Sequence, residues 1–201
     1  MRDGRLERWL DAMLATPGLT AVADPEAAWQ LHVEDSLSAL ALVRRFDGPI
    51  VDVGSGGGAP GIPLAAALPE REVTLLEANG RKCRFLEGAA SVFRNVEVVQ
   101  GRAEEQELEA FGVALARALA PPAVAAEWCL PLVRVGGAAI LYTGAVAGDL
   151  APVAVALGAG SPELHELAGA PSRRLVVLRK VATTPRGFPR RPGAARKRPL
   201  A

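Results

Sequence analysis

The sequence is poor in the residues that bind metals or form disulfides. Its 201 residues include two cysteines, Cys83 and Cys129, and two histidines, His32 and His165. The four lie far apart, with no CxxC or Cys/His spacing, so a zinc site has too few candidate ligands. We expect no bound metal, and we expect both cysteines to be small core or half-buried side chains.

Long apolar runs are also missing. No run reaches the length that a bilayer-spanning helix requires. Residues 1–9 carry charges where a signal peptide would need an apolar stretch. We therefore expect a cytoplasmic protein with no membrane association. The apolar content of 50% argues against global disorder, and the length suits one α/β domain with appendages.

Acidic residues are absent from the last part of the chain. Residues 173–201 hold ten Arg and Lys side chains and no Asp or Glu, a charge of +10. The first 172 residues hold 13 basic and 22 acidic side chains, a charge of −9. This asymmetry favours an anionic partner for the basic end, most simply nucleic acid, and the alternative is a solvated, disordered tail.

Strands and helices alternate from residue 50 onward. Apolar runs predict strands over 50–53, 73–77, 96–99, 113–116, 138–143, 163–168 and 174–180, with helices near 62–68, 80–92, 122–130 and 148–157. The alternation indicates an α/β fold with parallel βαβ units and an antiparallel final pair. Before it, helices are predicted over 4–15, through Trp29 and Leu31, and from Asp35 to Val43. We divide the chain into a helical extension (1–47), an α/β domain (48–183) and an irregular basic tail (184–201).

A glycine-rich turn joins the first predicted strand to a helix. The segment reads Ile50-Val-Asp-Val-Gly-Ser-Gly-Gly-Gly-Ala-Pro-Gly-Ile-Pro63. Such turns bring backbone N–H groups close to a nucleotide-like ligand. Residues 56–61 formally fit the GxGxxG pattern of dinucleotide sites. Pro60 and Pro63, however, remove two N–H groups that a pyrophosphate would need, so a ligand without phosphate at this point fits better.

An acid at the end of the second predicted strand narrows the choice of ligand. Glu77 stands 23 residues after Gly54, where a carboxylate can accept hydrogen bonds from both ribose hydroxyls. The alternative is an exposed charge at a strand end. The turn and the acid together predict an adenosine cofactor, and S-adenosylmethionine is favoured over NAD. An NAD-dependent oxidoreductase is disfavoured further because no Tyr/Lys or His/Asp set for hydride transfer is visible.

Motifs spread over nearly the whole chain are, in their combined order and spacing, more specific for one protein family than any single motif. The sequence resembles the bacterial small-subunit ribosomal RNA guanine-N7 methyltransferases, also called glucose-inhibited division protein B. The matching segments include His32-Val-Glu-Asp-Ser-Leu37, Asp52 to Leu64, Leu75-Leu-Glu-Ala-Asn-Gly-Arg-Lys-Cys-Arg-Phe-Leu86, Gly101-Arg-Ala-Glu104, Arg117-Ala-Leu-Ala120, Glu127 to Pro131, Gly136-Gly137, Tyr142 to Gly144, Thr184 to Gly193 and Arg198 to Leu200. Two positions depart from the family: Ala59 replaces a larger apolar residue, and Glu77 stands where Asp is frequent. A backbone N–H and a carboxylate remain at these positions.

The resemblance implies a fold and a reaction. The fold is that of class I S-adenosylmethionine-dependent methyltransferases, with a Rossmann-like, mostly parallel seven-stranded sheet whose last strand is antiparallel. The reaction is methyl transfer to N7 of a guanine in small-subunit ribosomal RNA, free or within the small ribosomal subunit. We expect the enzyme to act as a monomer.

The resemblance also implies which residues contact the cofactor. In the glycine turn they are Gly54, Gly56, Gly58 and Ala59, on the methionine and adenosine side. Glu77 and the adjacent Ala78 contact the ribose. Ala103 and Glu104 frame the adenine, and Arg117 lies beside the cofactor at the substrate mouth.

Candidates for the substrate side follow from spacing and from strand ends. His32 and Asp35 share one face of a helix. Together with Ser36 they could shape the site over the cofactor, or His32 and Asp35 could be a helix-anchoring hydrogen-bond pair. Arg102 and Arg117 each follow a predicted strand and therefore point toward the ligand-binding edge of the sheet, unless they are plain surface arginines.

The aromatic residues divide into two groups. Trp9, Trp29 and Trp128 lie in apolar helical patterns and are expected to pack in the core. Phe188, within Pro-Arg-Gly-Phe-Pro-Arg-Arg, could stack on an unpaired base or pack against the sheet.

No residue is expected to act as an obligatory general base, because guanine N7 has an available lone pair at neutral pH. Aligning nucleophile, methyl and sulfur is the main task. Two further alternatives are a methyltransferase for a small molecule or protein, which would not need the basic tail, and a non-enzymatic RNA-binding protein with a cofactor fold.

Overall fold

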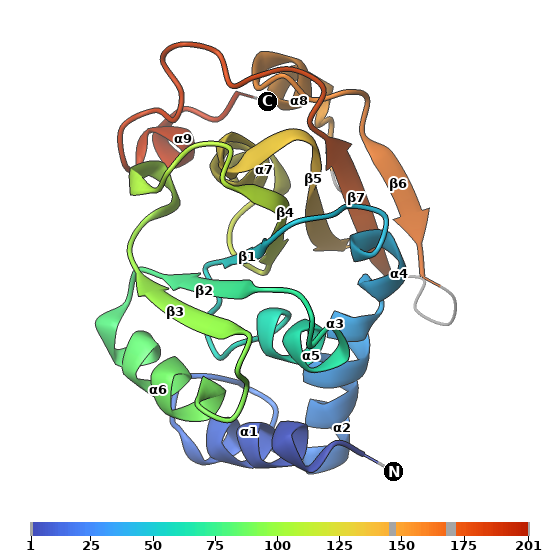
Figure 1. The fold of residues 1–201 in the computed structure, drawn as a ribbon, viewed down its shortest axis with the longest axis vertical. Helices are drawn as coiled ribbons and strands as arrows, with labels where there is room; N and C mark the ends of the chain where they lie inside the picture. The colour runs from blue at the N-terminus through green and yellow to red at the C-terminus, as the bar shows by residue number, and fades with distance from the viewer. Residues whose placement is uncertain (1, 145–147, 168–171, 201) are drawn as a thin grey trace.

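A computed structural model of the protein describes residues 2–144, 148–167 and 172–200 (Figure 1). Position 168 of the strand expected over 163–168 lies outside the described residues, as do Met1 and Ala201 at the limits of the predicted extension and tail. Within the described part of the chain, no helix has the length and hydrophobicity to cross a membrane.

One seven-stranded sheet forms the centre of the molecule, in the order β3-β2-β1-β4-β5-β7-β6. β1 to β5 run parallel, and β7 runs antiparallel between β5 and β6. The predicted mostly parallel α/β sheet with an antiparallel final strand is confirmed. The strands are β1 (Ile50–Val53), β2 (Val73–Glu77), β3 (Val96–Gln100), β4 (Phe111–Arg117), β5 (Val133–Gly144), β6 (Glu163–Glu166) and β7 (Arg173–Arg179).

Helices cover both faces of this sheet (Figure 1). Alternate strand residues point to opposite faces, so Ile50 and Leu75 join one apolar cluster while Val51 and Leu76 join the other. The first cluster packs under α1 (Gly4–Ala15), α2 (Pro25–Trp29), α4 (Leu40–Val43), α5 (Gly61–Ala67) and α6 (Gly80–Ala90). The second packs under α7 (Pro122–Cys129), the 3₁₀ turn η3 (Leu130–Leu132) and α8 (Ala151–Ala156).

The N-terminal extension packs against the sheet domain and its glycine turn. α1 begins at Asp3, whose carboxylate accepts the Arg5 N–H, and it buries Trp9 and Met13. The Trp9 indole donates to the carbonyl of Gly57, with 2.8 Å between Nε1 and O. The second and third predicted helices form one continuous stretch, because a π-helical segment η1 (Gln30–Glu34) links α2 to α3 (Asp35–Leu37).

The C-terminal tail is more regular than the sequence predicts. It contains a short helix, α9 (Ala194–Lys197), whose Ala195 is 2% exposed. Phe188 and Leu200 pack against the second apolar cluster, so of the two interpretations of Phe188 the structure supports packing. The tail therefore lies against the body of the protein, with α9 beside α7 (Figure 1).

Candidate cofactor and substrate site

The glycine turn connects β1 to α5 at the edge where the sheet order reverses. Ligands of open α/β sheets bind at this point, beyond the carboxyl ends of the strands. Gly54, Gly56 and Gly58 all have positive φ, at 70°, 60° and 100°. Gly54 and Gly56 line a cavity, whereas a Cβ on Gly58 would meet Ile62 Cδ1 at 2.5 Å. Gly58 therefore serves close packing, and the structure does not bring it to the cavity with the other predicted glycines.

Most backbone donors of this turn already have acceptors. The N–H groups of Gly54 and Ser55 donate to Leu76 O, at 2.7 and 3.1 Å. At the start of α5, Gly61 donates to Asp52 Oδ2 at 2.9 Å and Ile62 donates to Gly58 O at 2.7 Å. Pro63 has no N–H. The first turn of α5 thus lacks the free donors of a pyrophosphate site, as the two prolines predict.

Asp52 supports the glycine turn through hydrogen bonds of its side chain and its carbonyl. Its side chain is buried with 1% exposure, and burial raises the pKa of this carboxyl to about 7. It accepts the Gly61 N–H, and its own carbonyl accepts the Ser55 hydroxyl at 2.7 Å. These bonds fix where the turn leaves β1 and where α5 begins.

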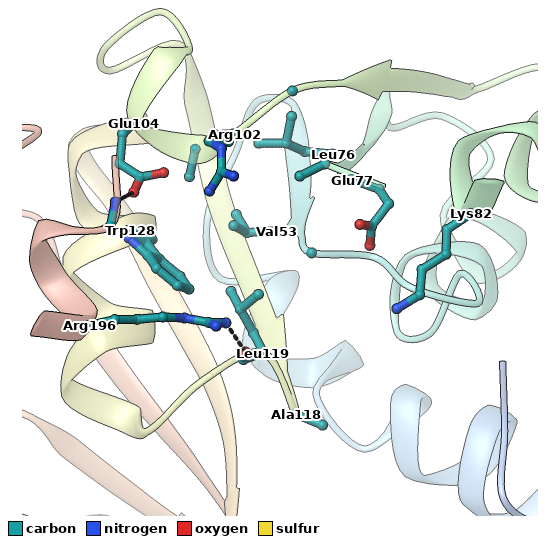
Figure 2. A pocket seen from close by; sticks show the side chains of 15 residues that line it. Val53, Leu76, Glu77, Lys82, Arg102, Glu104, Ala118, Leu119, Trp128 and Arg196 are labelled. Atoms are coloured by element: carbon teal, nitrogen blue, oxygen red, sulfur yellow. Dashed lines mark hydrogen bonds between the residues drawn. The ribbon is translucent and has the colours of Figure 1, made fainter. Parts of the chain in front are cut away.

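The two carboxylate oxygens of Glu77 bind two different segments, the glycine turn and the start of α6. Oε2 accepts the Gly56 N–H at 3.0 Å and Oε1 accepts the Asn79 N–H at 2.8 Å. The residue is only 8% exposed, and its carboxylate points into a cavity (Figure 2). Each oxygen keeps a lone pair for a further donor. The arrangement suits two adjacent hydroxyl groups.

Two cavities meet along the turn. The first, of about 330 Å³, is lined by the predicted residues Glu77, Ala78, Arg102, Ala103 and Glu104. The second, of about 370 Å³, is lined by Gly56, Ala59, His32 and Arg117. Gly54, Lys82 and Ala118 line both, so together the cavities form an elongated space past the glycine turn.

Arg117 ties the sheet to the N-terminal extension. It ends β4, and its guanidinium donates to Leu31 O at 2.6 Å, to Asp35 Oδ2 at 3.1 Å and to His32 Nδ1 at 3.1 Å. Arg173 donates to the same Asp35 oxygen. Arg117 is therefore no plain surface arginine. Its contacts bring His32 and Asp35 together as the shared helical face predicts, with two cations around one carboxylate at the mouth of the second cavity.

His32 is held in its neutral form. Burial, and then the charge of Arg117, lower its pKa to about 4. Because Nδ1 accepts from Arg117, the proton is assigned to Nε2, which lies 2.9 Å from Thr20 Oγ1. The ring closes the second cavity without carrying charge.

The lowered pKa of His32 predicts a loss of stability in acid. The unfolded chain binds a proton near pH 6.5 and the folded chain only near pH 4, so the free energy of unfolding falls as the pH drops through this window. In His32→Gln this part of the acid dependence should disappear. Urea unfolding of both proteins at half-unit steps from pH 7 to 4 measures it, and two parallel stability curves would contradict the assignment.

The other two substrate-side candidates take different positions. The Ser36 side chain is fully buried, and its hydroxyl donates to His32 O at 2.6 Å, so the structure does not bring it to the cavity with His32. Arg102, just beyond β3, is exposed and points into the first cavity near Glu104 (Figure 2).

Several residues that line the cavities are not predicted by the sequence patterns. Lys82, in the first turn of α6, directs its ammonium toward the space beside Glu77 (Figure 2). Its place three residues after the Asn79 cap, which follows the acid-bearing strand, is a usable signal. Trp128, expected in the core, is half-buried and lines the first cavity, as do Gly193 and Arg196 from the tail. No pattern in the local sequence indicates that Trp128, Gly193 and Arg196 line this cavity.

Comparison with known sequences identifies the family. Residues 6–151 match the sequence model described as rRNA small subunit methyltransferase G. The chain belongs to this family. Proteins named ribosomal RNA small subunit methyltransferase G are 40% identical in Rubrobacter xylanophilus and 39% identical in Moorella thermoacetica. The alignments cover 88% and 90% of this chain and 75% and 82% of those relatives.

Comparison with solved structures shows that this chain has the class I methyltransferase fold. A predicted O-methyltransferase from Agrobacterium tumefaciens matches with a TM-score of 0.61 and 20% identity, covering 74% of this chain and 81% of the other. The T. thermophilus 16S rRNA N2 G1207 methyltransferase, solved with AdoMet and guanosine, matches with a TM-score of 0.57 and 18% identity. That match covers 76% of this chain and 40% of the other chain. The predicted family, fold and S-adenosylmethionine dependence are confirmed.

Proposed function

We propose that this protein transfers a methyl group from S-adenosylmethionine to N7 of a guanine in small-subunit ribosomal RNA. The observation that carries the proposal is the Glu77 carboxylate, which is buried against a glycine turn most of whose donors are already bonded and which faces an open cavity. Such a site favours adenosine over a dinucleotide. Membership of the rRNA small subunit methyltransferase G family supplies the acceptor.

The residues of the site fit the cofactor. A Cβ on Gly54 would come within 2.3 Å of Leu119, and the positive φ of this glycine disfavours any other residue. Glu77 would hold the ribose, with Ala78 at its side, and Ala103 and Glu104 would frame the adenine. The methionine part would lie along Gly54, Gly56 and Ala59 toward the second cavity.

The chain's own residues bind and orient rather than move protons. When bound, the cofactor supplies a methyl group on a sulfonium centre that reacts with a lone pair. Guanine N7 is unprotonated at neutral pH, so no group has to remove a proton first. His32, with its lowered pKa and its Nδ1 bonded to Arg117, stays neutral and cannot readily accept one. We assign His32, Asp35 and Arg117 to shaping the mouth where the base enters.

Methyl transfer to defined acceptors tests the proposal. Tritiated S-adenosylmethionine is offered with small ribosomal subunits, and separately with their naked RNA, both lacking the modification. Label in the RNA, mapped to guanine N7, is the expected result. Label at another atom would overturn the N7 assignment, and binding without transfer would indicate a non-enzymatic RNA-binding protein. Transfer to a small molecule or protein instead would place the activity in a different class.

Exposed arginines of the tail are proposed to bind RNA phosphates. Arg186, Arg191 and Arg198 are exposed, and within the described part of the chain their guanidinium groups have no partner. Arg190, by contrast, is bound to Glu127 and is not available. We further propose that the enzyme is a monomer and that it acts in the cytoplasm, where it would meet the small ribosomal subunit.

Replacing these three arginines with glutamine should reduce the salt dependence of RNA binding. Three lost phosphate contacts lower the slope of log K against log salt by about 2 for single-stranded RNA. Fluorescence anisotropy with a labelled fragment of the RNA, from 50 to 300 mM KCl, measures the slope. Cofactor affinity, titrated in parallel, serves as the control for folding, and an unchanged slope would refute the role of the tail.

A further inference from the structure

The basic tail forms one wall of the first cavity. Gly193 and Arg196 line it together with Glu77, Ala103 and Glu104 (Figure 2). The tail thus lies at the end of the cavity where the proposed function places the adenine. If the tail served only to bind RNA, it would not need to line this cavity.

Three contacts place the tail at the cavity. The Arg196 guanidinium lies over the Trp128 ring, 5.2 Å from its centroid. It also reaches Leu119 O at 3.5 Å. The backbone N–H of Gly193 donates to Glu104 Oε1 at 3.2 Å. Trp128, Leu119 and Glu104 all line the same cavity, so the tail closes it through residues that face the ligand space.

A buried ion pair anchors this arrangement. The Glu127 side chain is only 3% exposed, and both of its oxygens accept from the Arg190 guanidinium. Arg190 also donates to Arg198 O at 2.8 Å, which ties the segment after α9 back to its start. Removing Arg190 would leave the buried Glu127 carboxylate without this partner, which is costly, so the pair holds the start of the tail in place. α9 and Gly193 lie between the two ends of this link.

We propose that the C-terminal tail is part of the cofactor site, with Arg196 as a positioning residue that closes the adenine end against Trp128. The inference rests on the proposed function in taking S-adenosylmethionine as the ligand of this cavity. A ligand that contacts the tail stabilises the tail in place, and by reciprocity a tail held in place raises the affinity for the ligand. Cofactor binding thereby orders the same segment that carries the arginines proposed to bind RNA.

Substitution of neighbouring cations in α9 tests the proposal. Arg196→Ala removes the closing side chain, whereas Lys197→Ala removes an equal charge from an exposed residue that is not among those lining the cavity. In calorimetric titrations with S-adenosylhomocysteine, we expect Arg196→Ala to weaken binding about three- to tenfold, the range of a lost cation–π contact. Lys197→Ala should stay within twofold of the unmodified protein. Equal effects of the two substitutions would overturn the proposal.

Limited proteolysis of the unmodified full chain gives a second measurement that needs no variant. Trypsin can cut after Arg196, within α9, and mass spectrometry follows the product. Saturating S-adenosylhomocysteine should slow this cut at least threefold, and an unchanged rate would overturn the coupling. If these results are obtained but ribosomal RNA is not methylated, the proposed function fails and the inference stands. If RNA is methylated but Arg196→Ala matches Lys197→Ala, the inference alone fails.

Discussion

Glu77→Gln is expected to weaken S-adenosylmethionine binding about 100-fold. The carboxylate accepts two backbone N–H groups, one on each oxygen, and would also accept the ribose hydroxyls. An amide has only one acceptor oxygen, so its NH₂ group must face the N–H of Gly56 or Asn79. The amide loses a charged hydrogen bond to the ribose, and the lost bond to Gly56 or Asn79 leaves the site less well placed for the ligand. Together these changes cost about 3 kcal/mol of binding free energy, which corresponds to two orders of magnitude in Kd.

Two companion variants make this result specific. Glu97→Gln changes an exposed glutamate on the neighbouring strand β3 and should leave Kd unchanged. Glu77→Asp keeps both oxygens and should lose far less affinity than the amide. Calorimetric titration with S-adenosylmethionine compares all three. A Kd for Glu77→Gln within threefold of the unmodified protein would show that the carboxylate does not hold the ribose.

Arg117→Ala is expected to lower the free energy of unfolding by about 3 kcal/mol. The side chain is 13% exposed and the Asp35 side chain 9% exposed, so removing the guanidinium leaves a nearly buried carboxylate short of one partner. The carbonyl of Leu31 and Nδ1 of His32 also lose their donor. Arg173 still contacts Asp35, which keeps the cost below that of a fully isolated charge.

Urea unfolding monitored by circular dichroism measures this loss. Arg94→Ala removes an exposed arginine whose side chain has no hydrogen bond or ion pair within the described part of the chain, and it should change stability by less than 0.5 kcal/mol. The double variant Arg117→Ala/Asp35→Asn should recover part of the loss, because it removes the stranded carboxylate. A single variant as stable as Arg94→Ala would show that the network does not anchor the extension.

The sheet could be predicted because strands buried on both faces are short apolar runs. β1 and β2 match the predicted bounds, and all seven expected strands form. The bounds fail at β4 and β5, which begin at Phe111 and Val133 instead of 113 and 138. In the sequence, Gly136 and Gly137 favour a break before the predicted strand 138–143. In the structure β5 continues through both glycines, because its pairing with β4 shifts register between Phe111 and Val113.

The site could be predicted only where chemistry follows directly from strand ends. Glu77 and Arg117 end β2 and β4, so their place at the ligand edge follows from the topology. The place of Ser36 could not be predicted in this way, because its position next to Asp35 in the sequence does not tell whether its side chain is buried. Trp128 and Arg196 were missed because the wall they form joins segments nearly 70 residues apart, and no local spacing encodes that contact.

The hydrogen bond from Trp9 to Gly57 and the placement of Gly193 beside Glu104 have a consequence for biosynthesis. The first helix is made before the turn it supports, and the segment that forms the cavity wall is made after all seven strands of the sheet. A nascent chain can form the sheet, yet its ligand pocket stays open until translation reaches the tail. Polypeptides released early by truncation or stalling would therefore compete poorly for the methyl donor.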